Sequence, residues 1–314
     1  MAWTALACPQ CSAPLPRVAL WRSVKCVSCG ALITKTESIV SRETFRQALI
    51  RAREGMVSGS ELVCRGQSYR LSQKLGAGEI SEVYLGQRLG PMPLLVTIKL
   101  SSSPEAAVHY AREATVLRAL HEQATEQAGV YAARRLPVVV AQGNVEGQGA
   151  RQALILRHPN GFWGSLAELN ARFPQGLDPR HGVWIWRRLL DLLHFIHAQG
   201  WSHGDVRPEH ALVSPQDHGA RLIGWASATR TRDAAFQAHD LRRSARVIAV
   251  LMSGAGDPEA GVRRLVPAPL ADLLLQASED LAFCQIQGAM GLDHELRRVA
   301  REVFGPPTFI PLEL

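Results

Sequence analysis

The sequence predicts an α+β protein in which a strand-rich part precedes a helix-rich part, with a small cysteine unit in front. Four cysteines stand as two CxxC pairs within the first 30 residues. Strand-like segments broken by glycines run from Tyr69 to Leu100, and helical periodicity dominates beyond residue 158. The chain has 314 residues, of which 46% are hydrophobic, so it can bury a sizeable core.

The cysteine unit predicts a structural metal site. CPQC at 8–11 and CVSC at 26–29 are separated by 14 residues. Two such knuckles can place four thiolates tetrahedrally around one zinc ion, and a set of redox-active or free thiols is the alternative. We expect residues 1–34 to resemble a zinc ribbon, a unit that docks on proteins or nucleic acids. The expected zinc ligands are Cys8, Cys11, Cys26 and Cys29.

The middle of the chain supplies the strands. Residues 35–62 are expected to form a helical linker, because apolar residues recur at helical spacing within 38–54. Three antiparallel strands are predicted from 69–100, a helix over 104–121, and two further strands over 136–145 and 150–158. The remaining predicted helices cover 165–173, 178–200, 239–254 and 268–278.

A glycine-containing loop between two strands is the first candidate site. In LGAGEISEVYLG at 75–86, Gly76 and Gly78 would let backbone N–H groups approach a phosphate closely. A hairpin turn alone also explains glycines there. Val83 follows at the spacing of a side chain that packs on a nucleotide base.

A lysine inside an apolar strand strengthens this interpretation. Lys99 in TIKL is costly to bury without a partner, and Glu113 on the following helix is placed to pair with it. An edge-strand charge and a solvated helix face are the simpler explanations for each residue alone. Their order and spacing favour an ion pair.

A second motif lies in the helix-rich part. WSHGDVRPEHALV at 201–213 follows a long predicted helix and precedes a short apolar strand. Asp205 in this loop could accept a proton from a hydroxyl substrate, or it could hydrogen-bond the loop backbone. RLIGWA at 221–226 then ends a returning strand.

Together these motifs resemble the protein-kinase fold, and the bacterial-type serine/threonine kinases in particular, from about Gln67 to about Phe304. The HGD form also resembles small-molecule kinases of the aminoglycoside-phosphotransferase kind. The resemblance implies a bilobal domain over 63–308, with an antiparallel-sheet N-lobe and a helical C-lobe. It also implies ATP contacts from Gly76, Gly78, Val83, Lys99 and Glu113.

Two departures concern the metal ligands of that family. His210 stands where the family has asparagine, and Gly224 stands where it has the metal-binding aspartate. Magnesium prefers oxygen ligands, so Mg²⁺ is a doubtful cofactor here. Ser81 also replaces the third glycine of the loop. Asp240, in contrast, matches the aspartate that braces the catalytic loop.

We therefore expect a catalytically impaired kinase, a pseudokinase, that acts as a nucleotide-responsive or scaffolding signalling module and docks through its zinc ribbon. The first alternative is an atypical active ATP-dependent phosphotransferase, acting on a protein or a small molecule. The second is a nucleic-acid-binding protein led by the ribbon, which the dispersed basic residues support weakly despite a net charge of +7. The sequence shows neither a signal peptide nor a run of about 18 apolar residues, so we expect a cytoplasmic protein without membrane insertion.

Overall fold

The computed structural model describes residues 59–78, 80–126, 135–159, 163–215 and 218–314, and the backbone of two short strands. These strands, β1 (Ser23–Lys25) and β2 (Leu32–Thr34), pair with each other. The four cysteines of the predicted zinc site and the predicted helix within 38–54 lie outside the described residues. The rest divides into a sheet unit, within 59–118 and 137–159, and a helical unit, within 119–136 and 163–314.

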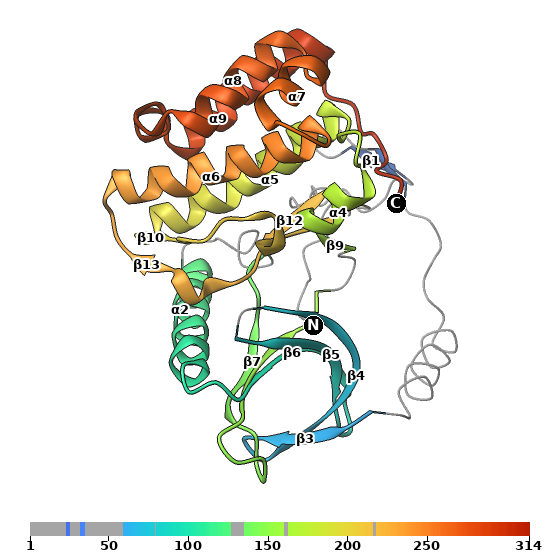
Figure 1. Cartoon of the computed structure of the whole chain (residues 1–314), viewed down its shortest axis with the longest axis vertical. Coiled ribbons are helices and arrows are strands. Elements are labelled where there is room, and N and C mark those ends of the chain that lie inside the picture. Colours follow the sequence, from blue (N-terminus) through green and yellow to red (C-terminus); the bar gives the residue numbers. More distant parts are fainter. Residues whose placement is uncertain are drawn as a thin grey trace. The chain divides into compact units, whose positions relative to one another are not determined.

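The sheet unit is a six-stranded antiparallel sheet in the order β3-β4-β5-β6-β8-β7 (Figure 1). Its strands are β3 (Glu61–Cys64), β4 (Gln67–Ala77), β5 (Glu82–Arg88), β6 (Leu94–Ser101), β7 (Val139–Asn144) and β8 (Gln152–Arg157). The three strands predicted from 69–100 are therefore confirmed as β4 to β6. Helix α2 (Ala106–Glu126) follows β6, as predicted.

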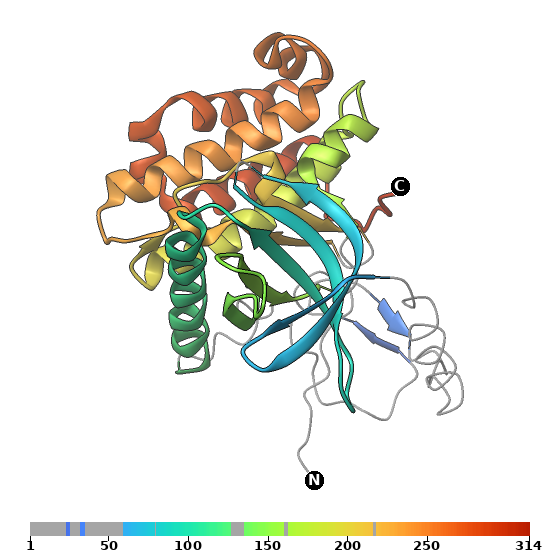
Figure 2. The same ribbon diagram turned by 60° about the horizontal axis from the view of Figure 1, so that its bottom comes forward.

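The sheet curls until its two edges meet. Arg65 and Gly66 both have positive φ, which is the geometry of a tight two-residue hairpin turn between β3 and β4. Cys64 at the end of β3 then forms an isolated bridge with Val145, just beyond β7 at the other edge. The curled strands are seen side by side in Figure 2. Their inner faces enclose a core that includes Tyr69 and Ile98.

The helical unit is built on two long helices, α5 (Pro179–Ala198) and α6 (Ala234–Ser253). The Asp178 side chain caps the start of α5 by accepting a hydrogen bond from the Arg180 N–H. The buried indole of Trp186 on α5 donates to the Ser244 hydroxyl on α6 at 3.0 Å. The other helices are α4 (Leu166–Arg172), α7 (Pro258–Leu265), α8 (Ala268–Glu279) and α9 (Leu281–Phe304).

Short strands carry the loops between these helices. β11 (Ala211–Ser214) pairs with β12 (Gly219–Leu222) and with β9 (Gly164–Ser165). β10 (Trp201–Ser202) pairs with β13 (Thr229–Arg230). Among the described residues, no helix is both long and apolar enough to cross a bilayer.

Three helices differ from the sequence prediction, and one of them, α7 (Pro258–Leu265), was not predicted. α6 begins at Ala234 rather than 239, because the Asp233 side chain accepts from the Ala235 N–H and caps the helix earlier. α9 was not predicted as a separate element. Gly288 interrupts the helical geometry of α9 with φ 59° and ψ 178°. The apolar residues before and after this break therefore do not follow one continuous helical period in the sequence.

Candidate active site

The glycine loop connects β4 to β5. Gly76 lies opposite Val83, and the Gly78 N–H donates to the Ser81 carbonyl at 2.7 Å. A Cβ added at Gly76 would meet nothing within 4 Å, and Gly76 and Gly78 are not among the glycines with positive φ. Neither packing nor backbone strain therefore demands glycine at 76. The glycines leave this stretch of backbone open to a close neighbour.

The predicted nucleotide residues of the sheet unit line up across three strands. Gly76 is registered with Val83, and Val83 with Lys99. Residues directly opposite one another share a face of the sheet, because side chains alternate along each strand. The loop, the expected base-packing residue and the lysine therefore occupy one row.

Lys99 and Glu113 form the expected ion pair. The Lys99 Nζ lies 2.9 Å from Oε1 and 2.8 Å from Oε2 of Glu113. The Glu113 side chain is 2% exposed and the Lys99 side chain 16%. The carboxylate thus has its charge compensated by the lysine, and removing either partner would leave a buried charge unpaired.

A second contact of α2 was missed by sequence reasoning. The Tyr110 hydroxyl donates to the Ser81 hydroxyl at 2.7 Å. Burial, with a smaller contribution from the charge of Glu113, raises the pKa of Tyr110 to about 12 against the lowering effect of the Ser81 hydrogen bond. The neutral phenol ties the loop to α2 one turn before Glu113. The only sequence signal was its spacing of three residues from that glutamate.

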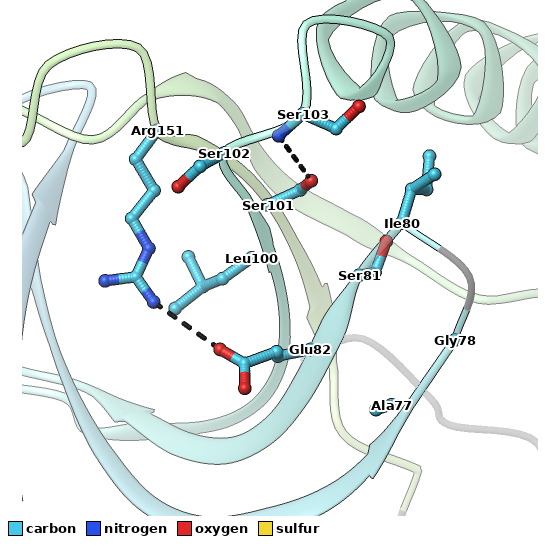
Figure 3. Close-up of a pocket in the computed structure, with 10 residues that line it drawn as sticks. All are labelled: Ala77, Gly78, Ile80, Ser81, Glu82, Leu100, Ser101, Ser102, Ser103 and Arg151. Atoms are coloured by element: carbon cyan, nitrogen blue, oxygen red, sulfur yellow. Dashed lines mark hydrogen bonds and ion pairs between the residues drawn. The ribbon is translucent and has the colours of Figure 1, made fainter.

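A cavity of about 370 Å³ opens beside the glycine loop, and Gly78 and Ser81 are among the residues that line it (Figure 3). Leu100 lines it, and Leu100 points to the opposite face of β6 from its neighbour Lys99. Arg151 and Glu82 approach each other across it at 3.9 Å. Gly78 is one of the predicted nucleotide residues, so the cavity adjoins the glycine loop of the predicted nucleotide site.

In the helical unit, Asp240 organises the loop that contains Asp205. The Asp240 carboxylate is fully buried and accepts from the Ser202 hydroxyl at 2.8 Å and from the backbone N–H groups of His203 and Gly204 at 2.7 and 2.8 Å. His197 lies 3.1 Å away. Burial raises the pKa of Asp240, but the hydrogen bond and charge of His197, with the other donors, outweigh burial and leave this pKa lowered. The bracing contact expected of Asp240 is present.

His203 joins this loop to the segment after β12. Its ring is fully buried, with Nε2 3.1 Å from the Ile223 carbonyl and the ring centre 4.5 Å from that of Trp225. Burial is the main cause that lowers the pKa of His203 to about 4. The ring is therefore a neutral structural group.

His218, in the turn before β12, is similar. Its ring stacks between Trp184 and Phe309 with ring centres 4.3 and 4.2 Å away, and its Nε2 lies 2.8 Å from the Ile310 carbonyl. Burial lowers the pKa of His218 to about 4.

Acidification is expected to destabilise the protein at pH values well above the ordinary pKa values of carboxyl groups. Between about pH 6.5 and pH 4, His203 and His218 bind protons in the unfolded chain but not in the folded one. The free energy of unfolding should therefore fall as the pH falls through this window, by up to about 1.4 kcal/mol per pH unit for each histidine. Urea unfolding at several pH values measures the slope. His218→Gln should make it shallower, and an unchanged slope would contradict the assignment.

Asp205 does not stand alone in its loop. Its Oδ2 lies 3.1 Å from His210 Nδ1 and 3.5 Å from Arg207 Nε. Arg207 also donates to His210 Nε2, at 3.2 Å from its terminal nitrogen. Because a guanidinium can only donate, Nε2 accepts and Nδ1 carries the proton that faces Asp205. Sequence reasoning missed Arg207, although it stands only two residues after Asp205.

Gly224 and His210 occupy one space. Gly224 ends the β12 strand segment with φ 78° and ψ 51°. A Cβ added there would lie 2.6 Å from Cε1 and 2.7 Å from both nitrogens of the His210 ring. Real Cβ atoms do not approach so closely, so any larger side chain at 224 requires the imidazole to move. The two departures from the kinase pattern are therefore physically coupled.

No group of three or more His, Cys, Asp or Glu side chains within the described ranges is arranged to hold a metal ion. The segment between the end of β12 and the start of α6 is shorter than the sequence predicts, because α6 begins at Ala234.

Gly204, between His203 and Asp205, has φ 77°, and a Cβ there would meet the Ser227 carbonyl oxygen at 2.7 Å. Glycine in the HGD motif is thus a packing requirement.

Comparison with known proteins agrees with this geometry. The model of the lipopolysaccharide kinase (Kdo/WaaP) family matches residues 60–266. Serine/threonine-protein kinase PknE of Mycobacterium bovis is 32% identical over 174 residues, 52% of this chain and 27% of PknE. Serine/threonine-protein kinase pkn2 of Myxococcus xanthus is 27% identical over 180 residues, 55% of this chain and 19% of that protein. The chain thus spans about a quarter or less of the length of these relatives.

Solved structures show the same fold. Vaccinia related kinase 3 superimposes with a TM-score of 0.55 at 15% identity, covering 80% of this chain and 92% of that chain. The Mycobacterium tuberculosis PknI kinase domain gives a TM-score of 0.52 at 18% identity, covering 78% and 99%. The predicted α+β kinase-like fold, with an antiparallel sheet followed by helices, is confirmed.

Proposed function

We propose that this chain, which belongs to the lipopolysaccharide kinase (Kdo/WaaP) family, is a pseudokinase: a kinase-like protein that binds nucleotide without relying on a metal ion and works as a signalling module or scaffold. One observation carries the proposal. The His210 ring fills the space that a metal-binding side chain at 224 would need. Phosphoryl transfer in kinases depends on charge neutralisation by metal ions held at these two positions.

The nucleotide part of the proposal rests on the sheet unit. The open backbone at Gly76, the side chain of Val83 and the Lys99–Glu113 pair are the features that a kinase uses to hold ATP. In the helical unit, the guanidinium of Arg207 is a permanent positive charge beside Asp205. Within the helical unit this cation offsets the charge of the Asp205 carboxylate without a metal ion.

ATP is expected to bind with the same affinity with and without Mg²⁺, and to lose at least about tenfold in affinity in Lys99→Ala. Lys99→Ala leaves the Glu113 carboxylate buried and unpaired, so Lys99→Met/Glu113→Gln tests binding in a protein without that charge. Isothermal titration calorimetry measures both. Lys74→Ala, which removes an exposed lysine paired with Glu82, is the matched control and should bind normally.

The same titration separates the alternative of an active phosphotransferase. Asp205 is retained with its side chain 31% exposed, and relatives of the chain are kinases. Affinity that requires Mg²⁺ or Mn²⁺, together with hydrolysis or transfer of the γ-phosphate, would establish the active enzyme. Absence of ATP binding under every condition would contradict the nucleotide part of the proposal and leave a scaffold alone.

We further propose that Cys8, Cys11, Cys26 and Cys29 hold one structural zinc ion. The pairing of β1 with β2 supports this, since the second CxxC pair falls between those strands in the sequence. The expected result is one zinc ion per chain by atomic absorption, and none in Cys26→Ser/Cys29→Ser. Full zinc content in that variant would contradict the assignment. The isolated Cys64→Ser is the control that should keep its zinc.

A further inference from the structure

Four exposed arginines lie on β13, on the segment that follows it and on α6, and together they form what we call the basic face: Arg230, Arg232, Arg243 and Arg246. Arg230 is registered with Trp201 in the β10–β13 pair. The Arg232 side chain lies beside Gly200, where an added Cβ would meet its Cγ at 3.3 Å. Arg243 donates to the Gly204 carbonyl. Figure 1 shows β10 and β13 beside the N-terminal part of α6.

One side of α6 extends this face. Phe236, His239, Arg243 and Arg246 recur at spacings of three and four residues, and all four are exposed. Phe236 is 56% exposed, which is unusual for a phenylalanine on a helix that buries its other side in a core. An aromatic ring and arginines on one helix face are the composition found in the centre of protein interfaces.

The positive charge of this region is not neutralised within its own segment. Residues 226–246 contain five arginines and two aspartates, and one of these, Asp240, is buried and engaged by the loop. A surface of one sign next to exposed apolar area steers and holds partners of the opposite sign.

We propose that the basic face, with Phe236, docks an acidic protein segment that carries an apolar side chain. Carboxylates would pair with the arginine guanidinium groups, whose planar forks match a carboxylate in two parallel hydrogen bonds. The apolar side chain would pack on Phe236. This inference specifies the class of protein that the proposed scaffold would bind. It rests on the proposed function only in taking the chain to be a scaffold.

A nucleic acid fits this face less well. The carboxylates of Asp205 and Asp233 lie along it, the first 31% exposed and the second at the start of α6. They interrupt the continuous positive potential that a phosphate backbone follows. Separate carboxylates on a protein segment can be placed around them.

The test uses the full-length chain and a fluorescein-labelled peptide of repeated Glu-Glu-Leu units, with a Gln-Gln-Leu peptide for comparison. Fluorescence anisotropy should show binding of the acidic peptide only, weakening as salt rises. Arg230→Glu/Arg246→Glu should weaken it at least about tenfold, and Phe236→Ser by a smaller factor. The matched control Arg264→Glu/Arg301→Glu makes the same charge change at exposed positions on α7 and α9, and should change the affinity less than about twofold.

Equal weakening in both charge-reversed variants would mean that net charge alone attracts the peptide, and would overturn the docking site. So would the absence of binding, or tighter binding of a single-stranded DNA oligonucleotide that Arg230→Glu/Arg246→Glu abolishes. ATP affinity is measured in the same proteins. If the acidic peptide does not bind while ATP does, the proposed docking on the basic face is rejected. If the wild-type protein does not bind ATP, the nucleotide proposal is rejected instead.

Discussion

Gly224→Asp on its own is expected to destabilise the protein by about 1–3 kcal/mol and to leave metal binding absent. The new Cβ would lie 2.6 Å from the His210 ring, which is held from both sides by Arg207 and Asp205. The imidazole would have to rotate out and give up those contacts. The left-handed backbone at 224 adds strain of its own, which is smaller for aspartate than for most other residues.

The double variant Gly224→Asp/His210→Asn should behave differently. Asparagine removes the ring and supplies an amide oxygen, so both positions offer the oxygen ligands that magnesium prefers. Thermal stability should recover toward that of the wild type, and ATP affinity should rise at least about tenfold on addition of Mg²⁺. Calorimetry with and without Mg²⁺ measures this. His210→Asn alone is the control, and a Gly224→Asp protein as stable as the wild type would show that the ring is no barrier.

Asp240→Ala is expected to produce the largest loss of stability, about 3–5 kcal/mol. The substitution leaves the Ser202 hydroxyl and the N–H groups of His203 and Gly204 buried without their acceptor. Urea unfolding measures it. Asp257→Ala removes an exposed carboxylate that only caps α7, and it should cost about 1 kcal/mol.

The pH dependence of this contribution has a definite sign. The pKa of Asp240 is lowered in the folded protein, so its stabilising contribution is complete above about pH 3.8 and is lost as the pH falls through its folded pKa. The Asp240→Ala penalty should therefore stay constant from neutral pH down to about pH 4.5. A penalty that grows or vanishes within that range would contradict the assigned hydrogen bonds.

Much of the fold was predictable because local signals and packing agree. The alternation of β4 to β6, the Asp178 cap of α5 and the Lys99–Glu113 pairing all follow from residues that serve both their own element and the core. The order of the motifs then identified the kinase-like fold. The start of α6 and the whole of α9 were less accessible, since an early cap and a glycine break override simple periodicity.

The site was predictable in its residues but not in its physical coupling. The sequence shows that positions 210 and 224 both depart from the kinase pattern. It does not show that the His210 ring occupies the space where a side chain at 224 would begin, because that depends on how β12 pairs with β11. The contacts of Tyr110 and Arg207 were missed for the same reason: each is a single polar side chain whose partner is distant or carries no distinctive motif.

Helix α2 holds the loop tip through Tyr110 and the strand lysine through Glu113, and these two residues lie one turn apart. Because both side chains project from the same helix, a rotation of α2 about its axis would displace both contacts at once. Helix α2 therefore links the position of the glycine loop to the position of the strand lysine. A ligand or partner that shifts α2 would therefore act on the glycine loop and on the Lys99–Glu113 pair at the same time.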